Sequence, residues 1–115
     1  MQLSTVAIAL VAALHVAFFI LEAVLWTSPK VMRLFQNTEE AAEATRVLAL
    51  NQGFYNLGSA ALLMGFYATG NTAGVMGVLL FLVCMGLVGA VTANWRIILL
   101  QSLPATVAFL LFYWG

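Results

Sequence analysis

The sequence predicts an all-α, polytopic membrane protein: an antiparallel bundle of four transmembrane helices, with a short amphipathic helix in the first cytoplasmic loop. Composition is the first observation, since 64% of the 115 residues are hydrophobic and 7% are charged, far outside the range of soluble domains. The second is that apolar residues run continuously over four long stretches, without the alternation typical of strands. The third is that a helix pairs its own backbone groups, as a hydrocarbon environment requires.

Four spans fit the length of the chain. A hydrocarbon core of about 30 Å takes roughly 20 helical residues to cross. We expect spans at residues 3–26, 47–67, 72–93 and 97–114, within a single domain of residues 1–115. The first apolar run has no basic segment before it and continues to Trp26, so we interpret it as a retained span rather than a secretory signal.

The basic residues predict the orientation. All four fall in the first and third connections, which share one side of a four-span bundle: Lys30, Arg33, Arg46 and Arg96. The positive-inside rule then places these connections in the cytoplasm and both termini outside.

The first connection, residues 27–46, opens with one predicted helix start. Ser28 can cap a helix that has Pro29 as its first residue. Residues 29–35 mix basic with apolar side chains, as a short helix lying among lipid headgroups does. We interpret the whole connection as a solvated linker anchored to lipid rather than as a lid over a ligand.

A second helix start follows in the same connection. Asn37 and Glu40 have the spacing of a capping box. We expect this helix to run directly into the second span, with Glu43 and Arg46 close enough to pair on its wet side.

Small residues mark the third span. Gly70 and Gly74 have the spacing that lets helix backbones approach closely, and Gly77, Gly86 and Gly89 follow. We therefore expect this span to pack tightly against its neighbours. The lone Cys84 lies in the middle of it, so an intramolecular disulfide is excluded.

Polar residues inside the spans are predicted to form two layers. At 1.5 Å per residue, one layer lies about 6 to 9 Å from the cytoplasmic helix ends, and the other lies roughly 15 Å in. The first layer comprises Glu22, Asn51, Gln52, Thr92 and Gln101, and the second comprises His15 and Asn56. Hydrocarbon offers no hydrogen-bond partner, so the stripe of His15, Glu22 and Trp26 and the stripe of Gln52, Asn56 and Ser59 should face the bundle centre.

Glu22 is the strongest functional candidate in this set. An ionisable residue within a span is costly and indicates a functional site, either as a carboxylate in a wet cavity or as a neutral acid. For His15, functional and structural roles remain equally open. The amides have a structural alternative, because interhelical amide bonds of about 0.6 kcal/mol hold membrane helices together without any further role.

Several kinds of site are excluded or disfavoured. One histidine and one cysteine, without paired ligand spacing, argue against a zinc or di-iron centre. No glycine-rich phosphate loop or basic cluster is present, and the chain has no aspartate for a Ser-His-Asp triad. We therefore expect no metal, no cofactor and no nucleic-acid partner.

Three segments resemble a known family: LHVAFFILEAVLWTSP at 14–29, NQGFYN at 51–56 and VGAVTANWRIILLQSLPA at 88–105. Together they are similar to the bacterial membrane family called "domain of unknown function 1304". The resemblance implies a four-helix fold in the bacterial inner membrane and no particular activity. This chain has Leu14 where the family often has an acidic residue before the histidine, which disfavours a mechanism that needs an adjacent carboxylate. The motif residues carried over are His15, Glu22, Trp26, Pro29, Asn51, Gln52, Gly53, Tyr55, Asn56, Gln101 and Pro104.

Three functions are compatible with these residues. The first is a cytoplasm-facing pocket that binds or transports a small polar or amphipathic molecule, a cation or a proton. The second is an intramembrane enzyme acting on a lipid, quinone or isoprenoid, with His15 and Glu22 as acid and base; these lie about 10 Å apart along a regular helix, so a bridging substrate or a helix distortion would be needed. The third is an accessory subunit of a larger membrane complex.

The expected partners follow from these functions. They are the lipid bilayer, a small-molecule or lipid ligand, and a second copy of the chain or another membrane protein. The predicted ligand-binding residues are His15, Glu22, Trp26, Asn51, Gln52, Tyr55, Asn56 and Gln101.

Overall fold

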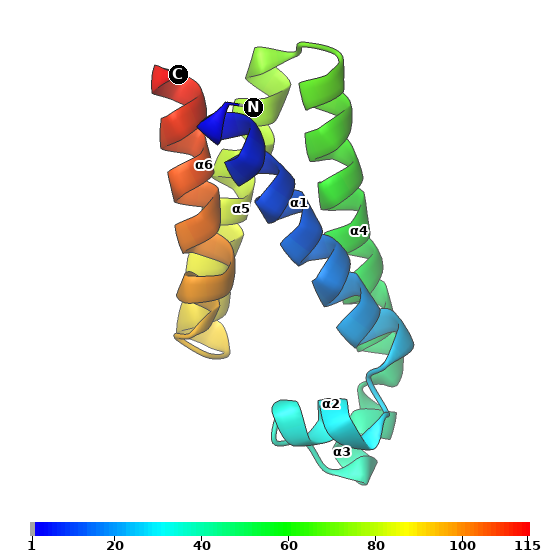
Figure 1. Cartoon of the computed structure of the whole chain (residues 1–115). Helices are drawn as coiled ribbons and strands as arrows, with labels where there is room; N and C mark the ends of the chain where they lie inside the picture. Colours follow the sequence, from blue (N-terminus) through cyan, green and yellow to red (C-terminus); the bar gives the residue numbers. More distant parts are fainter. Residues whose placement is uncertain (1) are drawn as a thin grey trace. The chain divides into compact units, whose positions relative to one another are not determined.

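The computed structural model describes residues 2–115 (Figure 1). This part of the chain contains helices and no strand, which confirms the all-α class. In chain order the elements are α1 (Leu3–Phe19), the π-helix η1 (Ile20–Val24), α2 (Pro29–Leu34), α3 (Glu39–Ala44), α4 (Arg46–Ala68), α5 (Thr72–Thr92), the π-helix η2 (Ile98–Ser102) and α6 (Leu103–Trp114). Two compact units divide the chain: the first comprises Met1–Leu14 and Ser59–Gly115, and the second is His15–Gly58.

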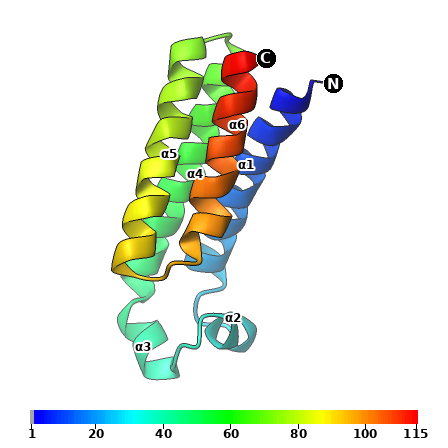
Figure 2. The ribbon, with the colours of Figure 1, turned by 90° about the vertical axis from the view of Figure 1, so that its left-hand side faces the viewer.

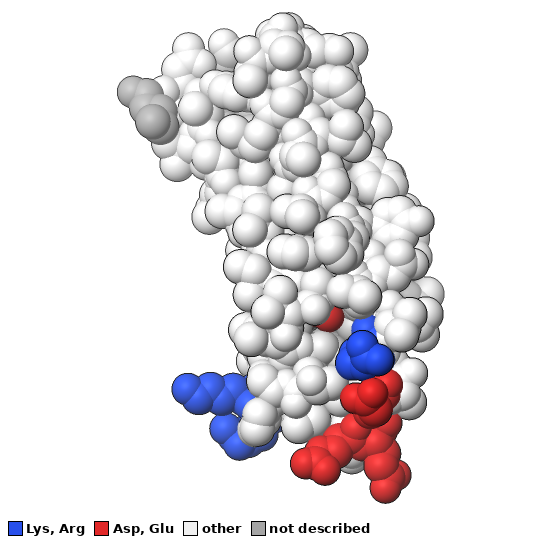
Figure 3. Space-filling model, turned by 90° about the vertical axis from the view of Figure 1, so that its right-hand side faces the viewer, with Lys and Arg blue, Asp and Glu red and all other residues white. Residues whose placement is uncertain are grey.

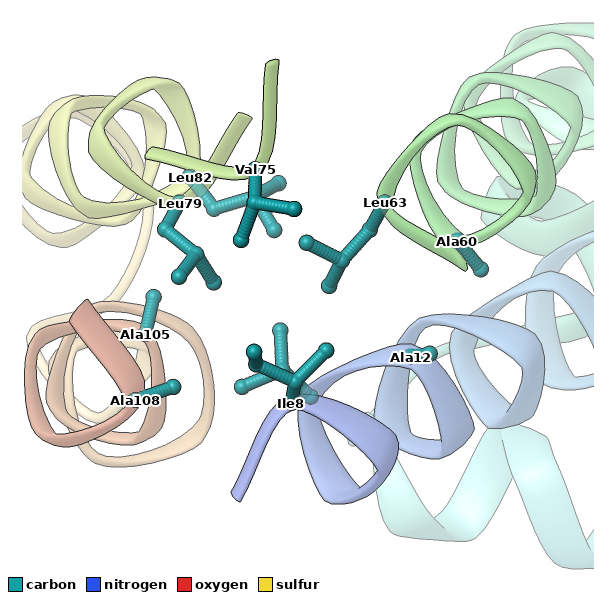
Figure 4. Packing of buried hydrophobic residues seen from close by; sticks show 10 residues of the cluster. Ile8, Ala12, Ala60, Leu63, Val75, Leu79, Leu82, Ala105 and Ala108 are labelled. Atoms are coloured by element: carbon teal, nitrogen blue, oxygen red, sulfur yellow. The ribbon is translucent and has the colours of Figure 1, made fainter. Parts of the chain in front are cut away.

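The first unit has one apolar core, to which four helices contribute (Figure 4). Branched side chains from α1, α4 and α5 meet small alanines of α6, so the helices can approach closely where the alanines lie. Thr5 and Tyr67 add a hydrogen bond between their hydroxyls, which joins α1 to α4 in this unit. The core residues are Ile8, Val11, Ala12, Ala60, Leu63, Val75, Leu79, Leu82, Ala105 and Ala108.

Glycines of α5 let neighbouring elements of the same unit approach this helix closely. A Cβ on Gly86 would lie 2.8 Å from the backbone nitrogen of Ser102, and one on Gly74 would meet the ring of Phe66. Ser102 in turn donates from Oγ to the carbonyl oxygen of Val83, at 2.9 Å. A Cβ on Gly89 would also lie 3.2 Å from the Ile97 side chain, so the close packing expected for these glycines holds at three of them, whereas Gly77 faces open space.

This difference gives a matched pair of variants in one helix. Gly86→Ala is expected to destabilise the protein by about 1–3 kcal/mol, because the added methyl meets the Ser102 backbone, which cannot simply rotate away. Gly77→Ala adds a methyl in open space and should stabilise the helix by roughly 0.5–1 kcal/mol. Thermal unfolding in detergent, followed by circular dichroism, should rank Gly77→Ala at or above wild type and Gly86→Ala below it. Equal midpoints for the two variants would contradict this account of the packing.

In the second unit, α2 starts as the sequence predicts. Pro29 is its first residue, and the Ser28 hydroxyl accepts a hydrogen bond from the Val31 amide at 3.3 Å. The predicted cap of α3 is wrong by one residue, because Thr38, not Asn37, accepts from the Ala41 amide, at 3.0 Å. Thr38 has the extended backbone that an N-cap needs, and its hydroxyl competes well for the role.

The expected continuous helix from the loop into the second span is also wrong. α3 ends at Ala44, Thr45 is its C-cap, and α4 begins afresh at Arg46 (Figure 2). The Thr45 hydroxyl donates to the carbonyl oxygen of Ala41, at 2.7 Å, so it stabilises this last turn. The predicted pair is confirmed, with Arg46 Nε 3.2 Å from Glu43 Oε1 on the exposed surface.

Charge is concentrated on the loop helices. All charged residues except Glu22 and Arg96 fall between Lys30 and Arg46. On the face drawn in Figure 3, blue and red atoms gather on this segment, and most of the remaining surface is uncharged.

Two helices are long and apolar enough to cross a membrane. They are Leu3–Val24 and Thr72–Thr92, and the apolar helix Ile98–Trp114 is shorter. In the most apolar 18-residue window of each helix, the chain itself buries only 28% in Leu3–Val24 and 22% in Thr72–Thr92. These windows thus remain largely uncovered by protein, unlike the core helix of a soluble domain.

Candidate functional site

Glu22 and Asn56 form the polar contact at the centre of the second unit. The Asn56 side-chain amide donates to the Glu22 carboxylate oxygen Oε1, at 2.6 Å. Asn56 is buried on α4, and Glu22 is half-buried on η1. A short hydrogen bond to a carboxylate is among the stronger kinds in proteins. The two residues that the sequence placed in different layers are therefore direct partners.

The helix that carries Glu22 is not regular. The sequence predicts one helix to Trp26, but the α-helical pattern ends at Phe19 and a π-helix covers Ile20–Val24. The Leu25 amide donates to the carbonyl oxygen of Ile20, at 3.0 Å, which is the five-residue spacing of a π-turn. No glycine or proline occurs between Phe19 and Leu25, so composition gave no signal of this turn. Short π-segments inside helices are frequent at functional sites.

His15 lies on α1, before the π-turn. It is 1% exposed, and its ring meets the Phe18 ring edge-on with centroids 5.1 Å apart. The π-turn is a distortion of the kind that acid–base chemistry between His15 and Glu22 would need. Glu22 nevertheless contacts Asn56 and His15 contacts Phe18, so these contacts give no support to a His15–Glu22 pair.

Trp26 uses its polar group to hold the loop. Its indole Nε1 donates to the Thr45 hydroxyl, at 3.1 Å, and its ring lies 5.3 Å from that of Phe35. Thr45 lies between α3 and α4, so Trp26 is hydrogen-bonded to the residue that separates the two helices. Sequence reasoning missed Thr45, because nothing local distinguishes it from a residue in a continuous helix.

The other predicted residues are more exposed. Asn51, Gln52 and Tyr55 are exposed on α4. The buried face of α4 instead follows Ala49, Gly53, Asn56, Ala60 and Leu63. The stripe predicted to face inward therefore holds for Asn56 and not for Gln52.

Two predicted residues lie in the first unit. Gln101 is half-buried on η2, so it too belongs to a π-helical segment. Thr92 is exposed, and its hydroxyl donates to the Val88 carbonyl of its own helix at 2.7 Å.

Neither of two hollows on the described residues is lined by Glu22 or Asn56. Within residues 2–115, no three His, Cys, Asp or Glu side chains gather closely enough to hold a metal ion. One hollow of about 310 Å³ is lined by Thr27, Met32, Glu39 and Glu43 of the second unit. A larger one of about 460 Å³, in the first unit, is lined by Gln2, Leu3, Ser4, Leu110, Leu111, Trp114 and Gly115.

Fold and site together define an all-α protein with two helices apolar enough to cross a membrane, and with an acid–amide pair between a π-turn and a neighbouring helix. The chain belongs to the family described as "Protein of unknown function (DUF1304)", which matches residues 9–113. No curated protein and no solved structure matches the chain. The family expected from the three sequence segments is thus confirmed.

Proposed function

We propose that this protein is a four-span protein of the bacterial inner membrane that binds a small cationic or amphipathic molecule, or a proton, at Glu22. The observation that carries the proposal is the neutral partner of Glu22. Its carboxylate accepts from the Asn56 amide, and the ion pair found within residues 2–115 is the exposed one between Arg46 and Glu43. The partner found for the Glu22 carboxylate is thus an uncharged amide.

A carboxylate among apolar helices requires neutralisation. Within a membrane span an uncompensated charge costs at least about 2.5–3.5 kcal/mol, and a proton or a bound cation removes that cost. Asn56 orients the carboxylate without neutralising it, since an amide donates a hydrogen bond but carries no charge. The pair thus leaves a carboxylate charge that a bound cation or a proton would neutralise.

Placement in the membrane rests on composition and exposure. Two long apolar helices remain mostly uncovered by the chain itself, which suits a lipid environment. The basic residues of the two connections favour their cytoplasmic location, with both termini outside. In this orientation Glu22 lies near the cytoplasmic end of its span, so the site would be loaded from the cytoplasm.

The exposed amides extend the proposal to ligand contacts. Asn51, Gln52 and Tyr55 lie within one and a half turns of Asn56 on α4, where they can orient a polar part of the ligand. Trp26 and His15 of the same unit remain proposed ligand-binding residues on the strength of their family motifs. At minimum, the protein binds this ligand; in the fuller form of the proposal it also transports the ligand across the membrane.

A second function, that of an accessory subunit, is favoured by the same exposed residues. Exposed amides on a helix in hydrocarbon favour hydrogen-bonding neighbours, and a second copy or another membrane protein could supply these. Purification in mild detergent separates the alternatives, because a subunit elutes with a stoichiometric partner. A protein that runs alone or as a homodimer and binds a ligand supports the first proposal.

Binding itself can be tested with tetraphenylphosphonium, an organic cation with an apolar body. Calorimetric titration of the purified protein in detergent should show saturable binding that becomes weaker as the pH falls, since protons and the cation compete for one carboxylate. An absence of saturable binding, together with an absence of proton release, would remove the proposed function.

A further inference from the structure

The π-turn at Glu22 is packed against a glycine of the neighbouring helix. A Cβ on Gly53 of α4 would lie 3.0 Å from the Ala23 Cβ, 3.1 Å from the Ala23 nitrogen and 3.2 Å from the Phe19 carbonyl oxygen. These distances are shorter than ordinary carbon contacts of about 3.5–4.0 Å. A side chain at position 53 would require the π-turn to shift by a few tenths of an ångström.

Gly53 approaches two backbone atoms of the neighbouring helix, the Ala23 nitrogen and the Phe19 carbonyl oxygen. In a regular α-helix the Ala23 amide would donate to the Phe19 carbonyl oxygen, four residues earlier. Here Phe19 is the residue before the π-helix and Ala23 lies within it. Gly53 therefore faces the stretch of helix where the α-helical bonding pattern gives way to the π-helical one.

The same face of α4 also holds Glu22. Gly53 and Asn56 are three residues apart and both are buried, so they lie on one side of the helix. One supports the backbone of the π-turn, and the other binds the carboxylate that the turn carries, at 2.6 Å. A π-turn contains one residue more per hydrogen-bonded turn than an α-turn, so it rotates the side chains within and after it about the helix axis. The direction of the Glu22 side chain thus depends on the turn.

We infer that Gly53 is a positioning residue for Glu22: it admits the π-turn at Ile20–Val24, and the π-turn directs the Glu22 carboxylate onto Asn56. This inference rests on the proposed cation site and explains how the direction of the Glu22 carboxylate in that site is maintained. Any side chain at position 53 pushes on the π-turn and turns the carboxylate away from its amide donor.

Gly53→Ala tests the inference, and Gly58→Ala is the matched control. Both substitutions remove a glycine from α4, but a Cβ on Gly58 meets nothing within 4 Å. The main readout is the infrared carboxyl band of Glu22, identified by subtracting the spectrum of Glu22→Gln. Gly53→Ala should displace this band and weaken tetraphenylphosphonium binding by roughly tenfold, the loss that corresponds to about one hydrogen bond. Gly58→Ala should leave both at their wild-type values.

A compensating exchange sharpens the test. Ala23→Gly combined with Gly53→Ala removes the nearest atom that the new methyl would meet, so the band should move part of the way back. An unmoved band in Gly53→Ala overturns the inference, as does an equal displacement of the band in Gly58→Ala. The inference is also overturned if the double variant shows the same band displacement as Gly53→Ala alone. The infrared band needs no ligand, so a protein that shows the expected displacements but neither binds the probe nor releases protons refutes the proposed function and leaves the role of Gly53 intact.

Discussion

Glu22→Gln is expected to weaken tetraphenylphosphonium binding by about 30-fold or more, because loss of one partner of a desolvated charge pair costs about 2–5 kcal/mol. Glutamine keeps the size of the side chain and can still accept from the Asn56 amide, so the helices should remain in contact. The competition between protons and the probe should disappear with the carboxylate. Titration calorimetry of both proteins over a range of pH measures the two effects together.

The control for this variant is Glu43→Gln. Glu43 is exposed and pairs with Arg46, and exposed pairs of this kind contribute about 0–1 kcal/mol. Its removal should leave the affinity for the probe unchanged and the thermal midpoint almost unchanged. If Glu22→Gln binds as tightly as Glu43→Gln, the cation is held elsewhere and the proposed site is wrong.

The all-α class was predictable because the sequence contains long, continuous apolar patterns. Continuous apolar runs identified the helices, and Ser28 with Pro29 identified the start of α2. The burial of Asn56 also followed from residue type, since an amide is costly against lipid. The functional importance of Glu22 stays a prediction. Residue type and spacing alone were sufficient to predict the helices, the start of α2 and the burial of Asn56.

The details that sequence reasoning missed depend on contacts between segments. The π-turn at Ile20–Val24 packs on Gly53, which lies about thirty residues away in the sequence, so no local pattern contains it. The hydrogen bond between the Trp26 indole and Thr45 likewise joins residues far apart in the sequence. Two layers were expected because depth was counted along each helix from its predicted end, whereas the Glu22–Asn56 contact depends on how η1 and α4 pack.

The last prediction concerns Asn56, and it separates stability from function. Asn56→Leu removes the donor that holds the Glu22 carboxylate and should destabilise the protein by about 1–3 kcal/mol, the cost of leaving a partly buried polar group without its partner. Asn51→Leu is the control, because Asn51 is exposed on the same helix and should tolerate leucine. Thermal unfolding in detergent measures both.

The double variant Glu22→Leu/Asn56→Leu completes the comparison. Replacing both partners by apolar groups removes the unsatisfied carboxylate and should recover most of the stability lost in Asn56→Leu, while binding of the cation is abolished. A double variant that is less stable than Asn56→Leu alone would mean that the pair serves mainly to hold the helices together. The expected result, a stable protein without binding, would mean that the acid–amide pair is retained for the ligand, since an apolar contact meets the needs of the fold equally well.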